Sequence, residues 1–189
     1  ISAAMLQDIV HFILVGHSER RYVFNETDDI ISKKMAAVIR NGITPILCVG
    51  ETAQEKAAGE TRQVLHDQLM VDLRNLTTSD VRNIVIAYEP VWAISDGHDF
   101  AKHKMASAKE IEAAVSTIRQ NIGHMFGKKT ANMVRIIYGG SSNPDNARSI
   151  LEVDGVDGLL PGGASLNYEY FSKMVAIAHE VANEQSGKE

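Results

Sequence analysis

The chain has 189 residues, of which 44% are hydrophobic and 23% are charged, as in an ordinary globular protein. Its net charge of −5 and the lack of a basic block argue against a nucleic-acid-binding protein, and no apolar run approaches the roughly 20 residues of a membrane helix. The single cysteine, Cys48, cannot form an internal disulfide. This and the lack of a recognisable signal peptide favour a reducing compartment, so we expect a cytoplasmic protein.

Apolar runs and helical patterns alternate along the first half of the chain. The predicted elements are the end of a helix over residues 1–8, a strand over 10–15, a helix over 29–40, a strand over 43–49, one long helix over 54–76 and a buried strand over 83–88. Thr27 is the expected N-cap of the helix over 29–40. Polar or glycine residues follow each of these strands.

The same alternation continues through the second half. A polar loop covers residues 95–106, and Ser107 and Glu110 form a capping box that opens the next helix. The remaining elements are a strand over 134–138, a short helix starting at Asn143–Pro144, a strand over 155–160 and a helix over 168–182. Strands joined by helical crossovers predict a parallel α/β sheet, and no linker or repeat divides residues 1–189, so we expect one domain.

Two side chains at predicted strand ends could perform proton-transfer chemistry. Glu89 directly follows a buried strand and precedes Pro90, and His17 follows the first strand. Taken alone, Glu89 could be a salt-bridged surface residue and His17 a structural histidine. Together they place a base and an imidazole at one edge of the sheet, where α/β enzymes carry their active sites. A dry carboxylate can take a proton from the carbon next to a carbonyl, and a neutral imidazole can polarise that carbonyl.

The surroundings of this pair point in the same direction. Residues 18–20 could begin a helical turn whose N–H groups disfavour the imidazolium, so we expect His17 to be neutral. The glycine-rich turns at 139–141 and 162–165 could present N–H groups to a phosphate, although a single such turn is usually only a tight turn.

Other reactive side chains have plainer explanations. Cys48 is most simply a small buried residue, because no base or cation is evident beside it. Asp96, His98, Asp99 and His103 could resemble a metal site, but their irregular spacing in a loop favours solvated side chains. We therefore expect no metal.

Five strings of the chain resemble the triosephosphate isomerase family. They are residues 15–21 (VGHSERR), 45–51 (PILCVGE), 87–94 (AYEPVWAI), 137–141 (IYGGS) and 162–166 (GGASL). The resemblance extends from Ile1 through Phe171. It implies an incomplete (β/α) barrel of the TIM type, with about five parallel strands and flanking helices that correspond to the fourth through eighth βα units of the family.

The resemblance also implies an activity and a set of site residues. The activity is the cofactor-free interconversion of dihydroxyacetone phosphate and D-glyceraldehyde 3-phosphate through an enediolate, in glycolysis and gluconeogenesis. The implied roles are Glu89 as base, His17 as electrophile, Glu19 as an acid beside them, Ser95, Ser141, Gly162 and Gly163 as phosphate ligands, and Pro90, Val91 and Trp92 as the hinge of a lid.

The chain departs from the family pattern at three places. The asparagine and lysine of the family's first strand have no counterpart here, the lid begins Ile94-Ser95-Asp96, and Pro161 stands where the family usually has valine. Missing cationic stabilisation should make any activity weak. Strand edges left unpaired invite association, so we expect a homo-oligomer or a complex with an N-terminal fragment. The alternative is an inactive truncated barrel that self-associates and at most binds phosphate.

Overall fold

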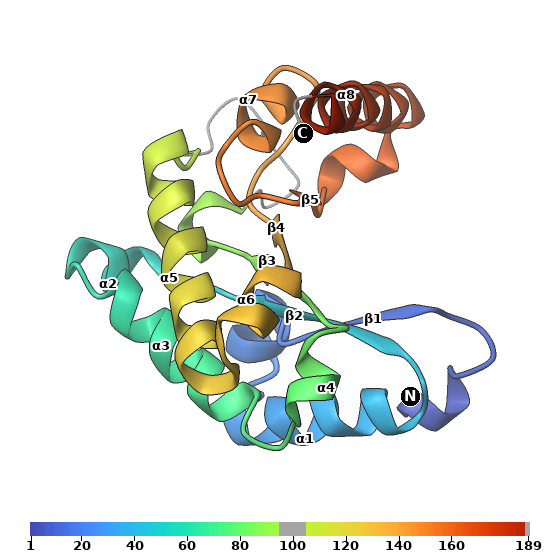
Figure 1. The fold of residues 1–189 in the computed structure, drawn as a ribbon, viewed down its shortest axis with the longest axis vertical. Helices are drawn as coiled ribbons and strands as arrows, with labels where there is room; N and C mark the ends of the chain where they lie inside the picture. The colour runs from blue at the N-terminus through green and yellow to red at the C-terminus, as the bar shows by residue number, and fades with distance from the viewer. Residues whose placement is uncertain (95–104, 188–189) are drawn as a thin grey trace.

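A computed structural model describes residues 1–94 and 105–187 of the chain (Figure 1). The strands are β1 (Phe12–Val15), β2 (Thr44–Val49), β3 (Val85–Tyr88), β4 (Arg135–Tyr138) and β5 (Gly158–Leu159). The α-helices are α1 (Asp28–Arg40), α2 (Ala53–Ala57), α3 (Thr61–Asp72), α4 (Thr78–Val81), α5 (Ala108–Phe126), α6 (Lys128–Met133), α7 (Ala147–Leu151) and α8 (Tyr168–Ser186). Short helical turns are η1 (Ala3–Met5), η2 (Glu19–Val23), η3 (Val91–Ala93) and η4 (Gly163–Leu166).

The five strands form one parallel sheet in the order β1-β2-β3-β4-β5. In the register of this sheet Leu14 pairs with Ile46, Ile46 with Val85 and Val85 with Arg135. Helical segments follow each of the strands β1 to β4 and return the chain to the side of the sheet where the next strand begins, as parallel pairing requires. The predicted α/β class, with about five parallel strands and flanking helices of an incomplete barrel, is therefore confirmed.

One face of the sheet packs against helices. Figure 1 shows α1, α3 and α5 side by side along this face. Apolar side chains of these helices belong to the same core cluster as side chains of the strands. The core residues on the strands are Val15, Leu47, Val49, Ile86, Tyr88, Ile136 and Tyr138, and those on the helices include Ile31, Met35, Leu65, Leu69, Ile111 and Ile118. This contiguous core fixes the strand ends against a rigid layer.

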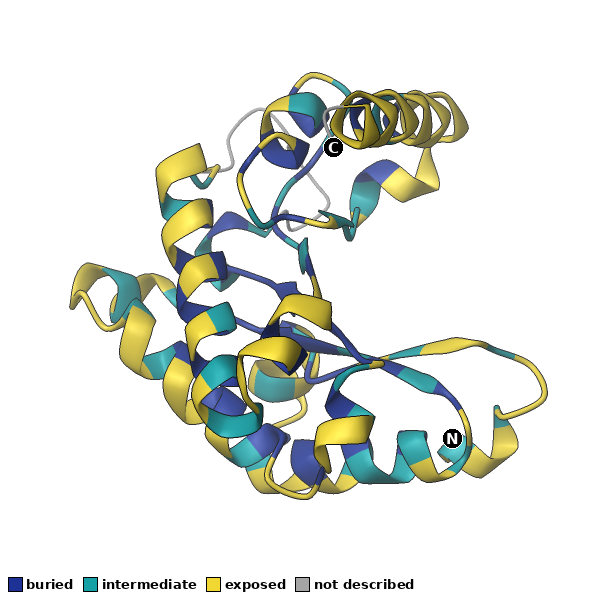
Figure 2. Cartoon of the chain, viewed as in Figure 1, coloured by how far each residue is buried: buried dark blue, intermediate teal, exposed yellow. Residues whose placement is uncertain are grey.

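The opposite face of the sheet is apolar but less covered. Alternation along the strands places Leu14, Ile46 and Ile137 there, together with Phe12. Phe12 is 49% exposed and Leu14 is 46% exposed, whereas Ile46 and Ile137 are half-buried. Helix α8 also buries little of itself, since only Met174 and Val181 are buried, and it is drawn largely exposed in Figure 2.

The single long helix predicted over residues 54–76 is wrong. The chain instead forms α2 and α3, with a break at Gly59, whose φ of +76° lies in the left-handed region that glycine tolerates. Thr52 and Glu55 form a capping box that starts α2. The break turns α2 away from α3 and brings Lys56 beside the end of β3.

Two further helix predictions need correction. The helix predicted over residues 1–8 is one 3₁₀ turn, in which Ile1 and Met5 are exposed while Ala3 and Leu6 lie partly buried against the core. The helix predicted from Asn143–Pro144 begins at Ala147, because the Asn143 side chain accepts from the N–H groups of Asp145 and Asn146 and forms a turn. The predicted Ser107–Glu110 capping box is confirmed at the start of α5.

Candidate active site

The candidate functional residues meet where the parallel strands end. Gly16 and His17 follow β1, Gly50 and Glu51 follow β2, and Glu89 follows β3. Parallel pairing brings these ends to one edge of the sheet, as the sequence predicts for an α/β enzyme. The structure thereby brings His17 and Glu89 together. They are far apart in the sequence, since Ser18, which follows His17, lies 71 positions before Glu89.

Glu89 is the buried carboxylate at the centre of this edge. Its side chain is only 4% exposed, its Oε1 lies 2.8 Å from His17 Nε2, and its Oε2 accepts the backbone N–H of Ser18 at 2.9 Å. Both carboxylate oxygens are therefore held by residues that follow β1. A carboxylate held by two donors and shielded from bulk water is suited to moving a proton.

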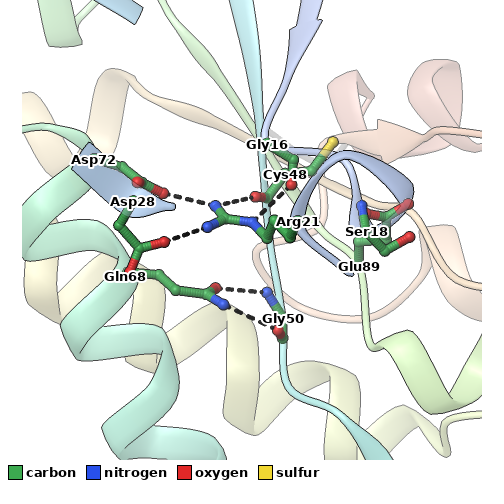
Figure 3. Close-up of polar contacts among 9 residues, drawn as sticks. All are labelled: Gly16, Ser18, Arg21, Asp28, Cys48, Gly50, Gln68, Asp72 and Glu89. Carbon is green, nitrogen blue, oxygen red and sulfur yellow. Dashed lines mark hydrogen bonds and ion pairs between the residues drawn. The ribbon is translucent and has the colours of Figure 1, made fainter. Parts of the chain in front are cut away.

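The backbone around Glu89 requires glycine at position 50. A Cβ on Gly50 would lie 2.0 Å from the Glu89 carbonyl oxygen, so no larger residue fits there. The Gln68 side chain accepts the Gly50 N–H at 2.9 Å and donates to the Gly50 carbonyl at 3.2 Å (Figure 3). The close approach of β2 and β3 at this point depends on Gly50, and Gln68 fixes it from α3.

The imidazole of His17 has both nitrogens in contact with partners. Its Nδ1 faces the backbone N–H of Glu19 at 3.3 Å, which favours the tautomer with the proton on Nε2, directed at Glu89. The turn that follows His17 was expected to keep His17 neutral, but the hydrogen bond that its imidazole donates to Glu89 outweighs burial and raises the pKa of His17. The expectation overlooked that the carboxylate itself contacts the imidazole and stabilises its charged form.

This contact predicts how His17 titrates. We expect the pKa of His17 to lie above its usual value in the wild-type chain and to fall in Glu89→Gln, which removes the negative charge. Because the folded-state pKa is raised, the stabilising contribution is fully present below the unfolded-state pKa and is lost as the pH rises through the folded-state pKa. Nuclear magnetic resonance of the imidazole C–H signals measures the titration, and an unchanged pKa in Glu89→Gln would contradict the assignment.

A buried arginine supports the turn that carries His17. The Arg21 guanidinium donates to the Gly16 carbonyl at 2.7 Å, to the Cys48 carbonyl at 2.9 Å and to Asp72 at 2.7 Å, and it also pairs with Asp28 (Figure 3). Asp72 is fully buried on α3, and burial raises its pKa to about 7 although Arg21 opposes this shift. One cation therefore joins the ends of β1 and β2 to helices α1 and α3.

The predicted hinge residues lie directly beyond Glu89. Val91 and Trp92 are in η3, and Pro90 precedes it. Glu51 holds this turn twice: its carbonyl accepts the Val91 N–H at 3.0 Å, and its carboxylate accepts the Trp92 indole N–H at 2.7 Å. Glu51 is 1% exposed and also accepts from Tyr88, so it is a buried anchor for the segment after the base.

The predicted phosphate ligands lie partly together. Ser141, Gly162 and Gly163 line a small cavity of about 40 Å³ between the ends of β4 and β5, whereas Ser95 falls outside the described residues. The Ser141 N–H donates to the Ala93 carbonyl at 2.8 Å, but its buried hydroxyl has no hydrogen-bond partner among the described residues. The phosphate assignment stays a prediction, with the hydroxyl rather than the N–H of Ser141 open to a ligand.

Glu19 and the loop residues complete the account of the predicted site. The Glu19 side chain is exposed, and the backbone N–H of Glu19 faces Nδ1 of His17. Asp96, His98, Asp99 and His103 lie outside the described residues, and within residues 1–94 and 105–187 no group of His, Cys, Asp and Glu side chains could hold a metal ion. No described helix is long and apolar enough to cross a membrane.

Sequence reasoning missed three residues that shape this site. Ser18 holds Glu89, Arg21 supports the His17 turn, and Glu51 anchors Trp92. Glu51 could have been identified in the same way as Glu89, since both are carboxylates that follow a strand. The role of Arg21 gave no such signal, because its partners lie on three other elements.

Comparison with known proteins agrees with this geometry. A family model described as triosephosphate isomerase matches residues 1–178. The chain is 42% identical over 176 residues to a triosephosphate isomerase of Thermoanaerobacter sp. (strain X514), and 45% identical over 176 residues to one of Lawsonia intracellularis (strain PHE/MN1-00). Each alignment covers 93% of this chain, and they cover 68% and 67% of the two relatives.

Proposed function

The chain belongs to the triosephosphate isomerase family, and we propose that it interconverts dihydroxyacetone phosphate and D-glyceraldehyde 3-phosphate. The observation that supports this activity most directly is the buried Glu89 carboxylate, held 2.8 Å from His17 at the end of β3. The reaction moves one proton between adjacent carbons through an enediolate, and a single carboxylate base is sufficient for it. This chemistry belongs to glycolysis and gluconeogenesis, and it needs no metal or organic cofactor.

The geometry suggests how the two side chains share the reaction. Glu89 takes the proton from the carbon next to the substrate carbonyl and returns it to the neighbouring carbon. His17 donates its Nε2 proton to the carbonyl oxygen, where negative charge develops. It then takes a proton from the hydroxyl on the neighbouring carbon, which becomes the new carbonyl, so the imidazole ends in its starting state. In the free chain that proton is directed at Glu89, so substrate binding has to replace one hydrogen bond of the base with one to the substrate.

The phosphate of the substrate is proposed to bind beside the ends of β4 and β5. The cavity lined by Ser141, Gly162 and Gly163 lies there, and the buried hydroxyls of Ser141 and Ser142 have no hydrogen-bond partner among the described residues. Ser95 remains a proposed ligand from the sequence. Pro90, Val91 and Trp92 are proposed as the hinge of the lid, because they connect Glu89 to the segment after residue 94.

A coupled isomerase assay on the purified chain tests the activity. Turnover of D-glyceraldehyde 3-phosphate is followed through an NADH-linked dehydrogenase that consumes dihydroxyacetone phosphate. Turnover that depends on Glu89 is the expected result. No turnover above buffer at high enzyme concentration would overturn the proposal and leave the alternative of an inactive barrel, for which titration with inorganic phosphate measures any remaining binding.

Residues 1–189 are proposed to act as one partial-barrel domain that self-associates. The support is the apolar sheet face opposite the helices, where Phe12 and Leu14 are about half exposed on the edge strand β1. A second copy of the chain, or an N-terminal fragment with further strands, would cover this face. A cytoplasmic location is proposed from the single buried cysteine, Cys48.

Light scattering tests this association. The wild-type chain should exceed the mass of one chain at micromolar concentration, and Leu14→Lys should shift it toward the monomer, because burying an unpaired ammonium is costly. Ile30→Lys is the matched control, since Ile30 is similarly exposed but lies on α1 away from the sheet face. A folded wild-type monomer would contradict the proposal, as would equal effects of the two variants.

A further inference from the structure

The indole of Trp92 is held on two sides by opposite charges. The Lys56 ammonium lies 3.1 Å from the centroid of the Trp92 ring, and the Glu51 carboxylate accepts the indole N–H at 2.7 Å. A cation over an indole face is attracted to the π electrons, while the polarised N–H attracts the anion. The two contacts together fix both the plane of the ring and its rotation within that plane.

Lys56 also connects two segments of the chain. Besides covering Trp92 in η3, its ammonium forms an ion pair with Glu110 in the first turn of α5. The Glu110 carboxylate in turn accepts the Ser107 N–H at 2.8 Å, and its pKa is lowered to about 2 by Lys56 and Ser107. Glu110 therefore remains charged near neutral pH and keeps its ion pair with Lys56 there.

Without the ammonium, Trp92 would have room to move. Lys56, Trp92 and Glu110 line a groove of about 440 Å³ between α2–α3 and α5. The Lys56 side chain covers the indole face within this groove, and Trp92 itself is only partly buried. Removing the positive charge would abolish the contact that holds the indole at the wall of this groove.

Movement of the Trp92 indole would affect Glu89 because few residues separate them along the backbone. Trp92 lies three residues after Glu89, in a turn whose Val91 N–H is held by the Glu51 carbonyl and whose Ala93 carbonyl accepts the Ser141 N–H. The indole and this turn therefore share one anchor, Glu51, and a released ring would disturb both. We propose that Lys56 is a positioning residue: through Trp92 and Glu51, it fixes the backbone after Glu89 and holds the carboxylate against His17. The kinetic consequence of this inference rests on the proposed isomerase function.

Kinetics of Lys56→Met give the first test. Methionine keeps an unbranched side chain but removes the charge, and we expect kcat/KM to fall by about three- to tenfold, mainly through kcat, because a cation–π contact of this kind is lost. Lys56→Arg should restore most of the rate, since a guanidinium can both stack on the indole and pair with Glu110. Lys33→Met is the control, a matched change at an exposed position of α1. A loss confined to KM, or equal losses in both methionine variants, would overturn the proposal.

Titration of His17 gives a second test that does not require activity. Glu89 and Glu19 are the charged groups that face His17, and both favour its protonated form. If Lys56 positions Glu89, then Lys56→Met lowers the pKa of His17, because the carboxylate moves away. Simple loss of the distant positive charge would raise that pKa, so the sign separates positioning from electrostatics. An inactive wild-type chain would refute the isomerase proposal alone, whereas an unchanged or raised His17 pKa in Lys56→Met would refute the role of Lys56.

Discussion

Replacing Glu89 with glutamine should lower the rate of triose phosphate isomerisation by roughly 10²–10⁴-fold, the usual contribution of a positioned general base. Glutamine has nearly the same volume, and its amide oxygen can still accept the Ser18 N–H, so the packing at the end of β3 should persist. The amide cannot accept the substrate proton. The loss should therefore fall mainly on kcat, measured in the coupled assay under saturating substrate.

Two controls make this result interpretable. Glu60→Gln is the same chemical change at an exposed position between α2 and α3, and it should leave kcat within about twofold of the wild type, as surface substitutions usually do. Urea unfolding should show that Glu89→Gln remains folded. A folded Glu89→Gln chain with wild-type kcat would remove Glu89 from the reaction and the proposed mechanism with it.

Replacing Arg21 with methionine should destabilise the fold by about 3–5 kcal/mol, because it leaves the fully buried Asp72 without its cation. The loss should depend on pH in a defined direction. Near pH 5 Asp72 can take up a proton in the folded variant, and near pH 8 the unpaired side chain must either be charged or hold a proton against its usual pKa. We therefore expect a larger destabilisation relative to the wild type at pH 8 than at pH 5, measured by urea unfolding.

The partner residue supplies the matched control for Arg21. Asp72→Asn in the Arg21→Met background removes the buried carboxylate, so it should recover part of the lost stability and abolish the difference between pH 8 and pH 5. Arg40→Met, an exposed position at the end of α1, should change stability by less than about 0.5 kcal/mol. A loss for Arg21→Met that matches Arg40→Met would show that the buried pair contributes nothing to the fold.

Local patterns predicted the secondary structure where one signal was decisive. Ser107 and Glu110 predicted the start of α5, and the β-branched run before Glu89 predicted β3. The prediction failed between residues 54 and 76, where apolar spacing continued across Gly59. That spacing is compatible with one helix or two, and the positive φ of Gly59 decides for two. Gly59 is visible in the sequence, but its positive φ could not be predicted from the sequence alone.

The site shows the same division. Glu89 and His17 could be identified because each follows a strand, and parallel strands end at one edge. The raised pKa of His17 could not be predicted, since it depends on a 2.8 Å contact with Glu89, which is far away in the sequence. The local turn alone favours the neutral form, whereas the Glu89 carboxylate acts in the opposite direction and raises the pKa of His17. The roles of Lys56 and Arg21 likewise come from partners on other elements.

The sequence by itself determined the family, the parallel α/β class and the two residues proposed to move the proton, because strand ends and long matching strings are local features. The tertiary structure decided how those residues interact. It placed the Glu89 carboxylate between His17 and Ser18, buried Arg21 against Asp72, and set Lys56 over Trp92. Distances and burial set pKa values and ion-pair strengths, and both arise only when elements distant along the chain pack together.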